Sequence, residues 1–231
     1  MDIKTTKISG NQLKILALVC MTLDHIGLIL LPQYTFLRVI GRLAFPIFAW
    51  MIAEGCRHTR NMGKYLALIL TVGFLYQLEF TLLTGSLKMN ILFTFALSVG
   101  LCWLLKAAKE KENRILGGLT LAYLAGVFLL TDILPLYLPR GYGIDYGFYG
   151  VLLPVAICFA KDRKQQLLVS GLLLSLLALW AEWPIQWASL LALPLLALYS
   201  GLRGKRKLKW LFYIYYPAHL SVLWLLLFLL R

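Results

Sequence analysis

The stretch that decides the fold covers residues 13–64 and reads LKILALVCMTLDHIGLILLPQYTFLRVIGRLAFPIFAWMIAEGCRHTRNMGK. It contains two apolar segments, each long enough to cross a lipid bilayer, which takes about 20 residues. The first segment carries Asp24 and His25 about halfway along, and the second carries two arginines and a glutamate. A charged side chain at membrane depth costs about 3 kcal/mol or more, so it normally faces a partner, a cavity or a substrate. This density of ionisable residues in consecutive segments indicates a functional site.

The composition of the whole chain is that of an integral membrane protein. Of its 231 residues, 61% are hydrophobic and 14% are charged, whereas soluble domains have roughly 45–50% apolar and about 25% charged residues. The net charge of +13 is also found in nucleic-acid-binding proteins, but here the basic residues form short clusters between apolar runs, as they do in cytoplasmic membrane loops. We therefore expect membrane lipid and no nucleic acid as a partner. The four cysteines are scattered and lack zinc-ligand spacing, so no metal site is predicted.

The hydropathy pattern predicts an all-α polytopic membrane protein. We expect a single domain, residues 1–231, with about nine transmembrane helices in one bundle. The seventh and eighth spans are the weakest because Glu182, Trp183 and Pro184 form a tight turn between them, so these two spans are alternatively one hairpin or a re-entrant pair. The predicted spans cover about 12–31, 36–55, 63–84, 89–106, 114–133, 144–160, 165–181, 184–201 and 209–230.

The distribution of charge predicts the orientation of the chain. Alternate loops of the nine-span arrangement hold 18 of the 23 Lys and Arg residues, and cytoplasmic loops are the ones enriched in Lys and Arg. We therefore expect a bacterial inner-membrane protein with a cytoplasmic N-terminus, an extracytoplasmic C-terminus and a first span that is retained rather than cleaved. Five acidic residues then fall toward the outer face, where they favour a cationic amine, whereas the basic inner rim favours an anionic cofactor. These acids are Asp24, Glu79, Asp132, Asp145 and Glu182.

His25 is the first candidate for chemistry, because imidazole takes up a proton near neutral pH. Asp24 precedes it and lies about 100° away around a helix, so it is not expected to pair with His25 directly and is placed to pair with Arg42 of the next span. His219 follows Pro217, which is expected to break or kink the last span; it is a second candidate base, and the roles of the two histidines are open to exchange. The structural alternative is a polar cluster that only holds spans together.

Two arginines lie on one face of the second span. Arg38 and Arg42 are spaced i, i+4, and Pro46 removes the hydrogen bond to the carbonyl of Arg42, so a kink is expected there. Their guanidinium groups suit a carboxylate, a phosphate or a developing oxyanion. The alternatives are snorkelling to the interface for Arg38 and an ion pair with Asp24 or Glu79 for Arg42.

Two further polar groups mark the inner and outer ends of the spans. The inner run is rich in donors that suit phosphates, with an ordinary basic loop as the alternative; the outer residues are candidates for lining a substrate pocket, with helix caps as the alternative for Asn90 and Asp145. The predicted cofactor-binding residues are Glu54, Arg57, His58, Arg60 and Asn61, and the predicted substrate-binding residues are Arg38, Glu79, Asn90, Asp145 and Tyr146.

Six short runs carry a resemblance to a known family. They are DHIG (24–27), LRVIGRLAFPIFAW (37–50), EGCRHTRN (54–61), NILFT (90–94), DYGFYG (145–150) and YYPAHL (215–220). The chain resembles the TraX family, which takes its name from a conjugation protein that acetylates the N-terminus of pilin. The resemblance implies a multi-pass acyltransferase that moves an acetyl group from acetyl-CoA to an amine, such as a pilin-like N-terminus, at the outer half of the membrane.

The resemblance and the residues together assign roles within the predicted site. His25 is expected to act as the base, oriented by Asp24 and Arg42, with His219 as a second proton carrier. Two other classes of function stay open. A proton-coupled transporter or export partner without acyl chemistry also needs buried ionisable residues, whereas a purely structural subunit of a secretion or conjugation assembly does not.

Overall fold

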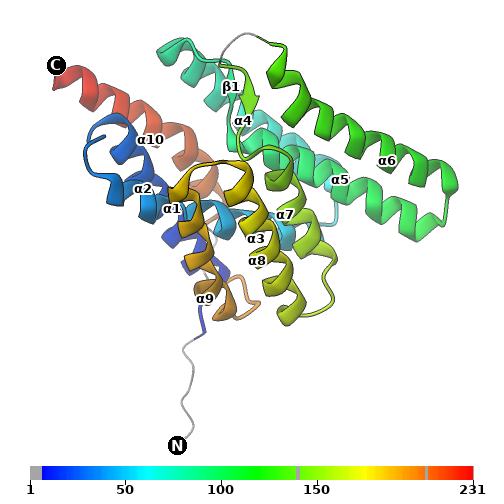
Figure 1. The fold of residues 1–231 in the computed structure, drawn as a ribbon. Coiled ribbons are helices and arrows are strands. Elements are labelled where there is room, and N and C mark those ends of the chain that lie inside the picture. The colour runs from blue at the N-terminus through cyan, green and yellow to red at the C-terminus, as the bar shows by residue number, and fades with distance from the viewer. Residues whose placement is uncertain (1–6, 139–140, 206–207, 231) are drawn as a thin grey trace, which may run out of the picture. The chain divides into compact units, whose positions relative to one another are not determined.

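The computed structural model describes residues 7–138, 141–205 and 208–230, and within them the chain is almost entirely helical (Figure 1). This confirms the all-α class. The longer helices are α1 (Gly10–Ile29), α3 (Ala44–His58), α4 (Met62–Thr84), α5 (Ile91–Lys111), α6 (Arg114–Phe128), α7 (Gly147–Phe159), α8 (Arg163–Trp180) and α10 (Lys209–Leu229). The shorter elements are α2 (Thr35–Gly41), η1 (Leu129–Ile133), η2 (Leu134–Leu136), η3 (Pro184–Leu191), α9 (Ala192–Ala197) and the strands β1 (Lys88–Met89) and β2 (Gly143–Ile144).

Six helical stretches among the described residues are long and apolar enough to cross a membrane. They correspond to the first five predicted spans and to the last one, so the chain is a polytopic membrane bundle. The predicted sixth and eighth spans correspond to shorter apolar helices, and α8 is not among the six, so the count of nine stays a prediction. The six stretches are Gly10–Ile29, Thr35–His58, Met62–Thr84, Ile91–Lys111, Arg114–Leu136 and Trp210–Leu229.

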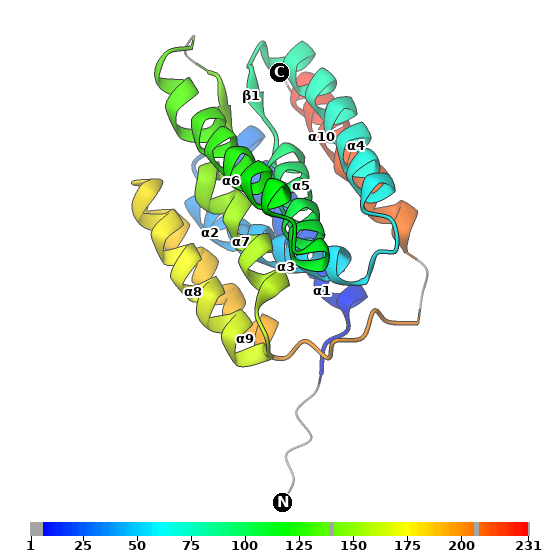
Figure 2. The same ribbon diagram turned by 90° about the vertical axis from the view of Figure 1, so that its right-hand side faces the viewer.

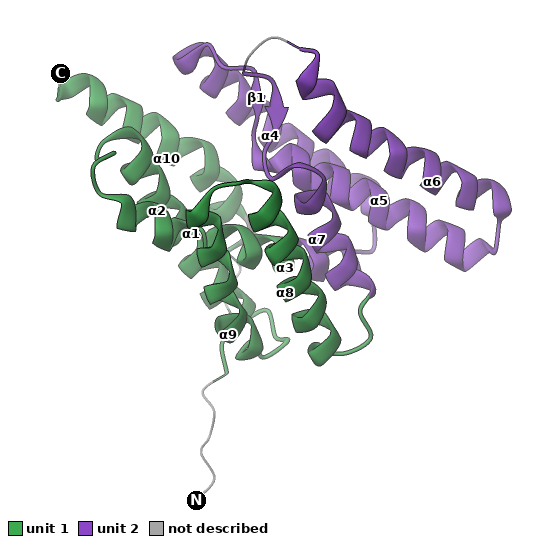
Figure 3. Ribbon diagram, in the orientation of Figure 1, with its two compact units in different colours: residues 1–51, 160–231 green, residues 52–159 purple. Residues whose placement is uncertain are grey.

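The chain forms two compact units, shown in different colours in Figure 3. The first unit consists of residues 1–51 and 160–231, and the second consists of residues 52–159. The division falls inside α3, between Met51 and Ile52. The expectation of a single domain is not tested by this division and stays a prediction.

In the first unit, α1 and α2 lie very close together because glycines face the contact. A Cβ atom added to Gly41 would overlap the side chain of Asp24, and one added to Gly27 would lie 2.8 Å from the Cβ of Leu37. Real Cβ atoms do not come that close, so both positions require glycine in this arrangement. The close approach brings the charged residues of α2 next to the middle of α1.

Two prolines in the first unit act differently from one another. The second predicted span is divided into α2 and α3 by a turn at Arg42 and Leu43, close to the kink predicted from Pro46, which lies in the first turn of α3 where a missing N–H is tolerated. Pro217, by contrast, lies inside α10, which continues from Lys209 to Leu229. Of the two predicted effects of Pro217, the break is not found, because the helix continues through it, and the kink stays a prediction.

In the first unit, α8 also packs beside η3 and α9 (Figure 2). The tight turn predicted at Glu182–Pro184 is present, since α8 ends at Trp180, Glu182 has a φ of 51° and η3 begins at Pro184. Arg163 at the start of α8 lies over the rings of Trp50 and Tyr199, at 5.0 and 4.9 Å from their centroids. Its guanidinium therefore binds inside the unit rather than facing solvent as a simple loop charge.

The second unit is built from α4, α5, α6 and α7, and α5 packs against each of the other three. Figures 1 and 2 both show α5 and α6 side by side. The β1 and β2 strands pair in parallel near one end of α5. Large apolar side chains such as Phe74, Leu82 and Leu121 are exposed on the outer faces of α4 and α6, which is the surface expected to contact lipid.

Candidate functional site

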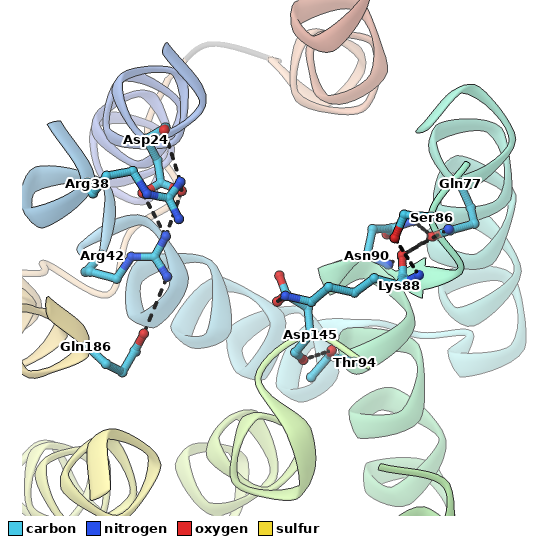
Figure 4. Close-up of polar contacts among 10 residues, drawn as sticks. All are labelled: Asp24, Arg38, Arg42, Gln77, Ser86, Lys88, Asn90, Thr94, Asp145 and Gln186. Carbon is cyan, nitrogen blue, oxygen red and sulfur yellow. Dashed lines mark hydrogen bonds and ion pairs between the residues drawn. The ribbon is translucent and has the colours of Figure 1, made fainter. Parts of the chain in front are cut away.

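A carboxylate with two arginines lies at the contact of α1 and α2 in the first unit (Figure 4). The Oδ2 atom of Asp24 is 2.9 Å from Nη1 of Arg38 and 2.7 Å from Nη2 of Arg42. Arg42 also donates from Nη1 to the side-chain carbonyl of Gln186 in η3, at 3.4 Å. The Asp24–Arg42 ion pair predicted from the sequence is thus present, and Arg38 joins it instead of extending to the membrane interface.

The environment of this cluster explains why its charges are tolerated. Asp24 and Arg42 are each only 8% exposed, and a buried charge is stable when it is paired and hydrogen-bonded. The ring of Trp183 adds a cation–π contact, with its centroid 5.3 Å from Arg38 and 5.2 Å from Arg42. The three side chains together carry two positive charges and one negative charge. Trp183 and Gln186 were not predicted, because nothing in the sequence places η3 next to α2.

A second cluster, a pair of histidines, lies on another face of α1, and its first member directly follows Asp24 in the sequence. Nδ1 of His25 is 2.7 Å from Nε2 of His219 in α10, and the two rings are stacked with centroids 4.9 Å apart. Asp24 and His25 are consecutive residues, yet Asp24 binds arginines of α2 whereas His25 binds α10. The structure therefore brings the two candidate bases together and does not place Asp24 as the hydrogen-bond partner of His25.

The hydrogen bonds of His219 determine which nitrogen of His25 is basic. Nδ1 of His219 lies 3.0 Å from the backbone carbonyl of Tyr215, and because a carbonyl only accepts, this nitrogen carries the proton. In the neutral ring Nε2 of His219 is then an acceptor, so Nδ1 of His25 donates to it. Nε2 of neutral His25 consequently carries the lone pair, and it makes no hydrogen bond within the described part of the chain.

Tyr215 supports the histidine pair in two ways. Its ring is stacked on His219, with centroids 5.6 Å apart and planes inclined by 3°. Its hydroxyl shares a hydrogen bond of 2.7 Å with the hydroxyl of Thr22, which itself donates to the carbonyl of Leu18. Thr22 and Tyr215 were missed in the sequence, although the second belongs to the YYPAHL run, because their importance depends on α1 and α10 being neighbours.

At the end of α3 in the second unit, part of the predicted cofactor-binding set is engaged in internal contacts. Arg57 donates from Nε to the carbonyl of Cys158 at 2.8 Å and from Nη2 to that of Ile157 at 2.6 Å. Glu54 lies 3.8 Å from Arg57 and 3.7 Å from His58, whose side chain is 76% exposed. The bonds of Arg57 join the end of α3 to the end of α7, which neither the predicted cofactor-binding role nor the alternative of an ordinary basic loop anticipated.

The last two residues of that predicted set have a different setting. Arg60 and Asn61 line a pocket at the turn between α3 and α4. Asn61 is the N-cap of α4, and its Oδ1 accepts from the backbone N–H of Lys64 at 2.8 Å. The positions of Arg60 and Asn61 therefore fit the predicted cofactor-binding role, which stays a prediction.

Two of the predicted substrate-binding residues of the second unit, Asn90 and Asp145, directly follow β1 and β2 and are drawn in Figure 4. Asn90 is the N-cap of α5, and its side-chain amide donates to the carbonyl of Gly73 at 2.9 Å and to Gln77 at 3.1 Å. Asp145 binds the amine of Lys88 at 3.1 Å, and its backbone carbonyl accepts from Thr94 at 2.5 Å. Asn90 thus matches the alternative of a helix cap, whereas Asp145 is joined to a cation.

The other two members of that set differ in position. Glu79 lies in the C-terminal half of α4 and is partly exposed, and Tyr146 has a left-handed φ of 63° just before α7 begins. Their predicted role in substrate binding stays a prediction. No group of three His, Cys, Asp or Glu side chains within the described ranges is arranged to hold a metal ion.

Comparison with known proteins gives a family and a relative that covers most of the chain. The family model described as TraX protein matches residues 9–227. A protein of Dichelobacter nodosus, described as probable fimbrial assembly protein FimC of serogroup H1, is 30% identical over 249 residues, which cover 93% of this chain and 94% of that protein. An uncharacterized protein of Rickettsia prowazekii is 52% identical over 40 residues, or 17% of this chain and 16% of that protein. No solved structure matches.

Proposed function

This chain belongs to the TraX family, and we propose that it is a membrane-embedded acyltransferase that moves an acetyl group from acetyl-CoA to an amine. The observation that carries the proposal is the histidine pair of α1 and α10, in which Nδ1 of His25 lies 2.7 Å from Nε2 of the buried His219. Attack of an amine on a thioester requires a group that removes a proton from the nitrogen. A histidine with a free Nε2 at membrane depth supplies such a group.

In the proposed reaction, Nε2 of His25 takes the proton that the amine loses as its nitrogen bonds to the acetyl carbon. The thioester of acetyl-CoA supplies the activated acyl group, and its sulfur leaves and takes up a proton. His219 lies in line to stabilise the imidazolium of His25, because its Nε2 accepts from Nδ1 of His25. The pair accommodates one extra proton readily but not two, since a second would set two N–H groups against each other.

The neighbouring arginine cluster has a supporting role in this proposal. Arg38 and Arg42 together carry one more positive charge than Asp24 neutralises. A fixed excess positive charge in a site shielded from water stabilises an oxyanion that develops during acyl transfer. Asp24 then serves to hold the guanidinium groups in place, which differs from the sequence-based expectation that it orients His25.

The amine acceptor is proposed from two independent indications. The relative from Dichelobacter nodosus is described as a fimbrial assembly protein, and the distribution of acidic residues in the sequence favours a cation at the outer face. Both suit the N-terminal amine of a pilin-like subunit presented outside the inner membrane. We propose the corresponding orientation, with the N-terminus in the cytoplasm and the acetyl-CoA side inside.

A proton-coupled transporter or export partner is the second candidate, because a proton-sharing histidine pair inside a helix bundle also suits proton movement. The experiment that separates the two is a release assay. Purified protein in detergent is mixed with acetyl-CoA, and free CoA is followed with and without small peptides that have a free N-terminus. We expect CoA release that depends on the peptide, together with peptide acetylation detected by mass. No release with any amine would contradict the enzyme and favour the transporter.

A further inference from the structure

A pocket of about 400 Å³ lies in the second unit, where the turn between α3 and α4 meets one face of α5. The turn contributes Arg60, Asn61 and Gly63 to its lining, and α5 contributes Trp103, Lys106 and Glu110. The three residues of α5 follow one another at spacings of three and four, which places them on one helix face. The pocket thus combines an aromatic ring, two cations and one carboxylate.

The aromatic residue that lines this pocket, Trp103, is accessible from outside. Trp103 is 46% exposed, and the residue opposite it is a glycine, so that a Cβ on Gly63 would lie 3.4 Å from the indole ring. Any larger side chain at position 63 would occupy the space beside the indole. An exposed indole next to an empty space is suited to stacking with a planar base, which contributes appreciably to nucleotide binding.

The two cations of the pocket differ in how firmly the protein holds them. Nζ of Lys106 donates to the carbonyl of Cys56 at 2.5 Å, which fixes the ammonium at the end of α3. Arg60 is exposed and makes no hydrogen bond or ion pair within the described residues. The N-terminus of the 23-residue α4 adds partial positive charge at the same place. Phosphate groups are recognised by this combination of guanidinium, ammonium and helix N-terminus.

From this lining we infer that the pocket binds the adenosine diphosphate part of an acyl-CoA. Trp103 stacks on the adenine, Arg60 and Lys106 bind the phosphates, and Glu110, two turns from Trp103, accepts from the amino group of the base. The volume is at the lower end of the range for small-molecule sites, which suits the nucleotide part and not the whole molecule. The identity of the ligand rests on the proposed function, whereas the pocket and its chemistry do not.

The inference divides the predicted cofactor-binding residues into two groups. Arg57 is held by two backbone carbonyls of α7 and Glu54 lies next to it, so both shape the end of α3. Arg60 and Asn61 line the pocket with Trp103 and Lys106. The last two residues were not singled out in the sequence, because Lys106 resembles any basic residue at a helix end and Trp103 resembles any aromatic residue near a membrane interface.

The test is equilibrium binding of CoA and of adenosine 3′,5′-diphosphate to the full chain, purified in an uncharged detergent. We expect Trp103→Ala and Arg60→Gln each to weaken binding of both probes about tenfold, and Gly63→Leu to weaken it at least as much by filling the pocket. The matched controls are Trp180→Ala, at a tryptophan that is 43% exposed, and Lys64→Gln, at an exposed cation outside the lining. Both controls should bind like the parent.

Four outcomes decide the inference. Equal CoA binding by the parent and all three pocket variants would overturn the inference. It would also be overturned if the pocket variants lost binding to phosphatidylglycerol nanodiscs but kept their affinity for CoA, because the pocket would then be a site for anionic lipid. Acetyl-CoA turnover separates it from the proposed function: pocket variants should raise KM at unchanged kcat. Binding through the pocket without any CoA release would support the nucleotide site while contradicting the acyltransferase.

Discussion

Asp24 and His25 are adjacent on α1 and are both ionisable, but they belong to different networks. Asp24 faces α2, where two arginines neutralise it and a glycine at position 41 lets the helices touch. His25 faces α10 and shares a hydrogen bond with a residue 194 positions away. In the first network one carboxylate holds two arginines in place, whereas the second network retains a basic nitrogen and suits proton transfer. Two consecutive residues of α1 thus have different tasks: Asp24 holds the arginines in place, and we propose that His25 takes part in the chemistry.

Substitution of Asp24 should have the largest effect on stability. Asp24→Asn removes the charge that compensates Arg38 and Arg42, and breaking a buried ion pair on one side costs about 3–5 kcal/mol. We expect a clear fall in the thermal unfolding midpoint in detergent, whereas His25→Asn should shift it much less. The comparison of Asp24 with His25 fails if the two variants unfold at the same temperature.

A double-mutant cycle sharpens the same point. Arg42→Gln alone should also destabilise the protein, and the combination with Asp24→Asn should cost less than the sum of the two, because the residues are in contact. Simple additivity would mean that the ion pair contributes little in the membrane-embedded protein.

The glycine contact between α1 and α2 should give a smaller effect. Gly41→Ala introduces a Cβ that overlaps Asp24, and overpacking of a close contact typically costs about 1–3 kcal/mol. Unfolding in detergent should therefore shift down, with Gly117→Ala as the matched control, since nothing lies near an added Cβ there. Equal midpoints for both variants would show that the helices are not as close as described.

The sequence predicted the parts of the site that depend on charge and helix periodicity. Asp24 and Arg42 are opposite charges in consecutive spans, so their pairing follows from the cost of leaving either alone in lipid. Arg38 shares a face with Arg42 by its spacing, although its own bond to Asp24 was not foreseen. Asn90 at the start of α5 caps the helix, as its residue type favours.

Contacts between segments distant in the sequence were not predictable. Nothing in the periodicity of α1 or α10 indicates that His25 and His219 touch, because hydropathy does not specify which spans are neighbours. The same holds for Arg57, whose guanidinium binds carbonyls of α7 about 100 residues later. Pro217 does not break α10, because a proline that usually ends a helix in water is tolerated in a membrane helix, where neighbouring groups satisfy the freed carbonyl.

The central claim, that His25 is the base of an acyl-transfer reaction, is tested most directly by the turnover of His25→Ala with acetyl-CoA and a peptide amine. Loss of a general base reduces the rate by about 10²–10⁴-fold, so we predict a fall in kcat of that size for His25→Ala in a protein that still folds. We predict a smaller fall in kcat for His219→Ala. Leu28→Ala, which alters an exposed residue of the same helix, should turn over like the parent. Near-parental turnover of folded His25→Ala would contradict the account.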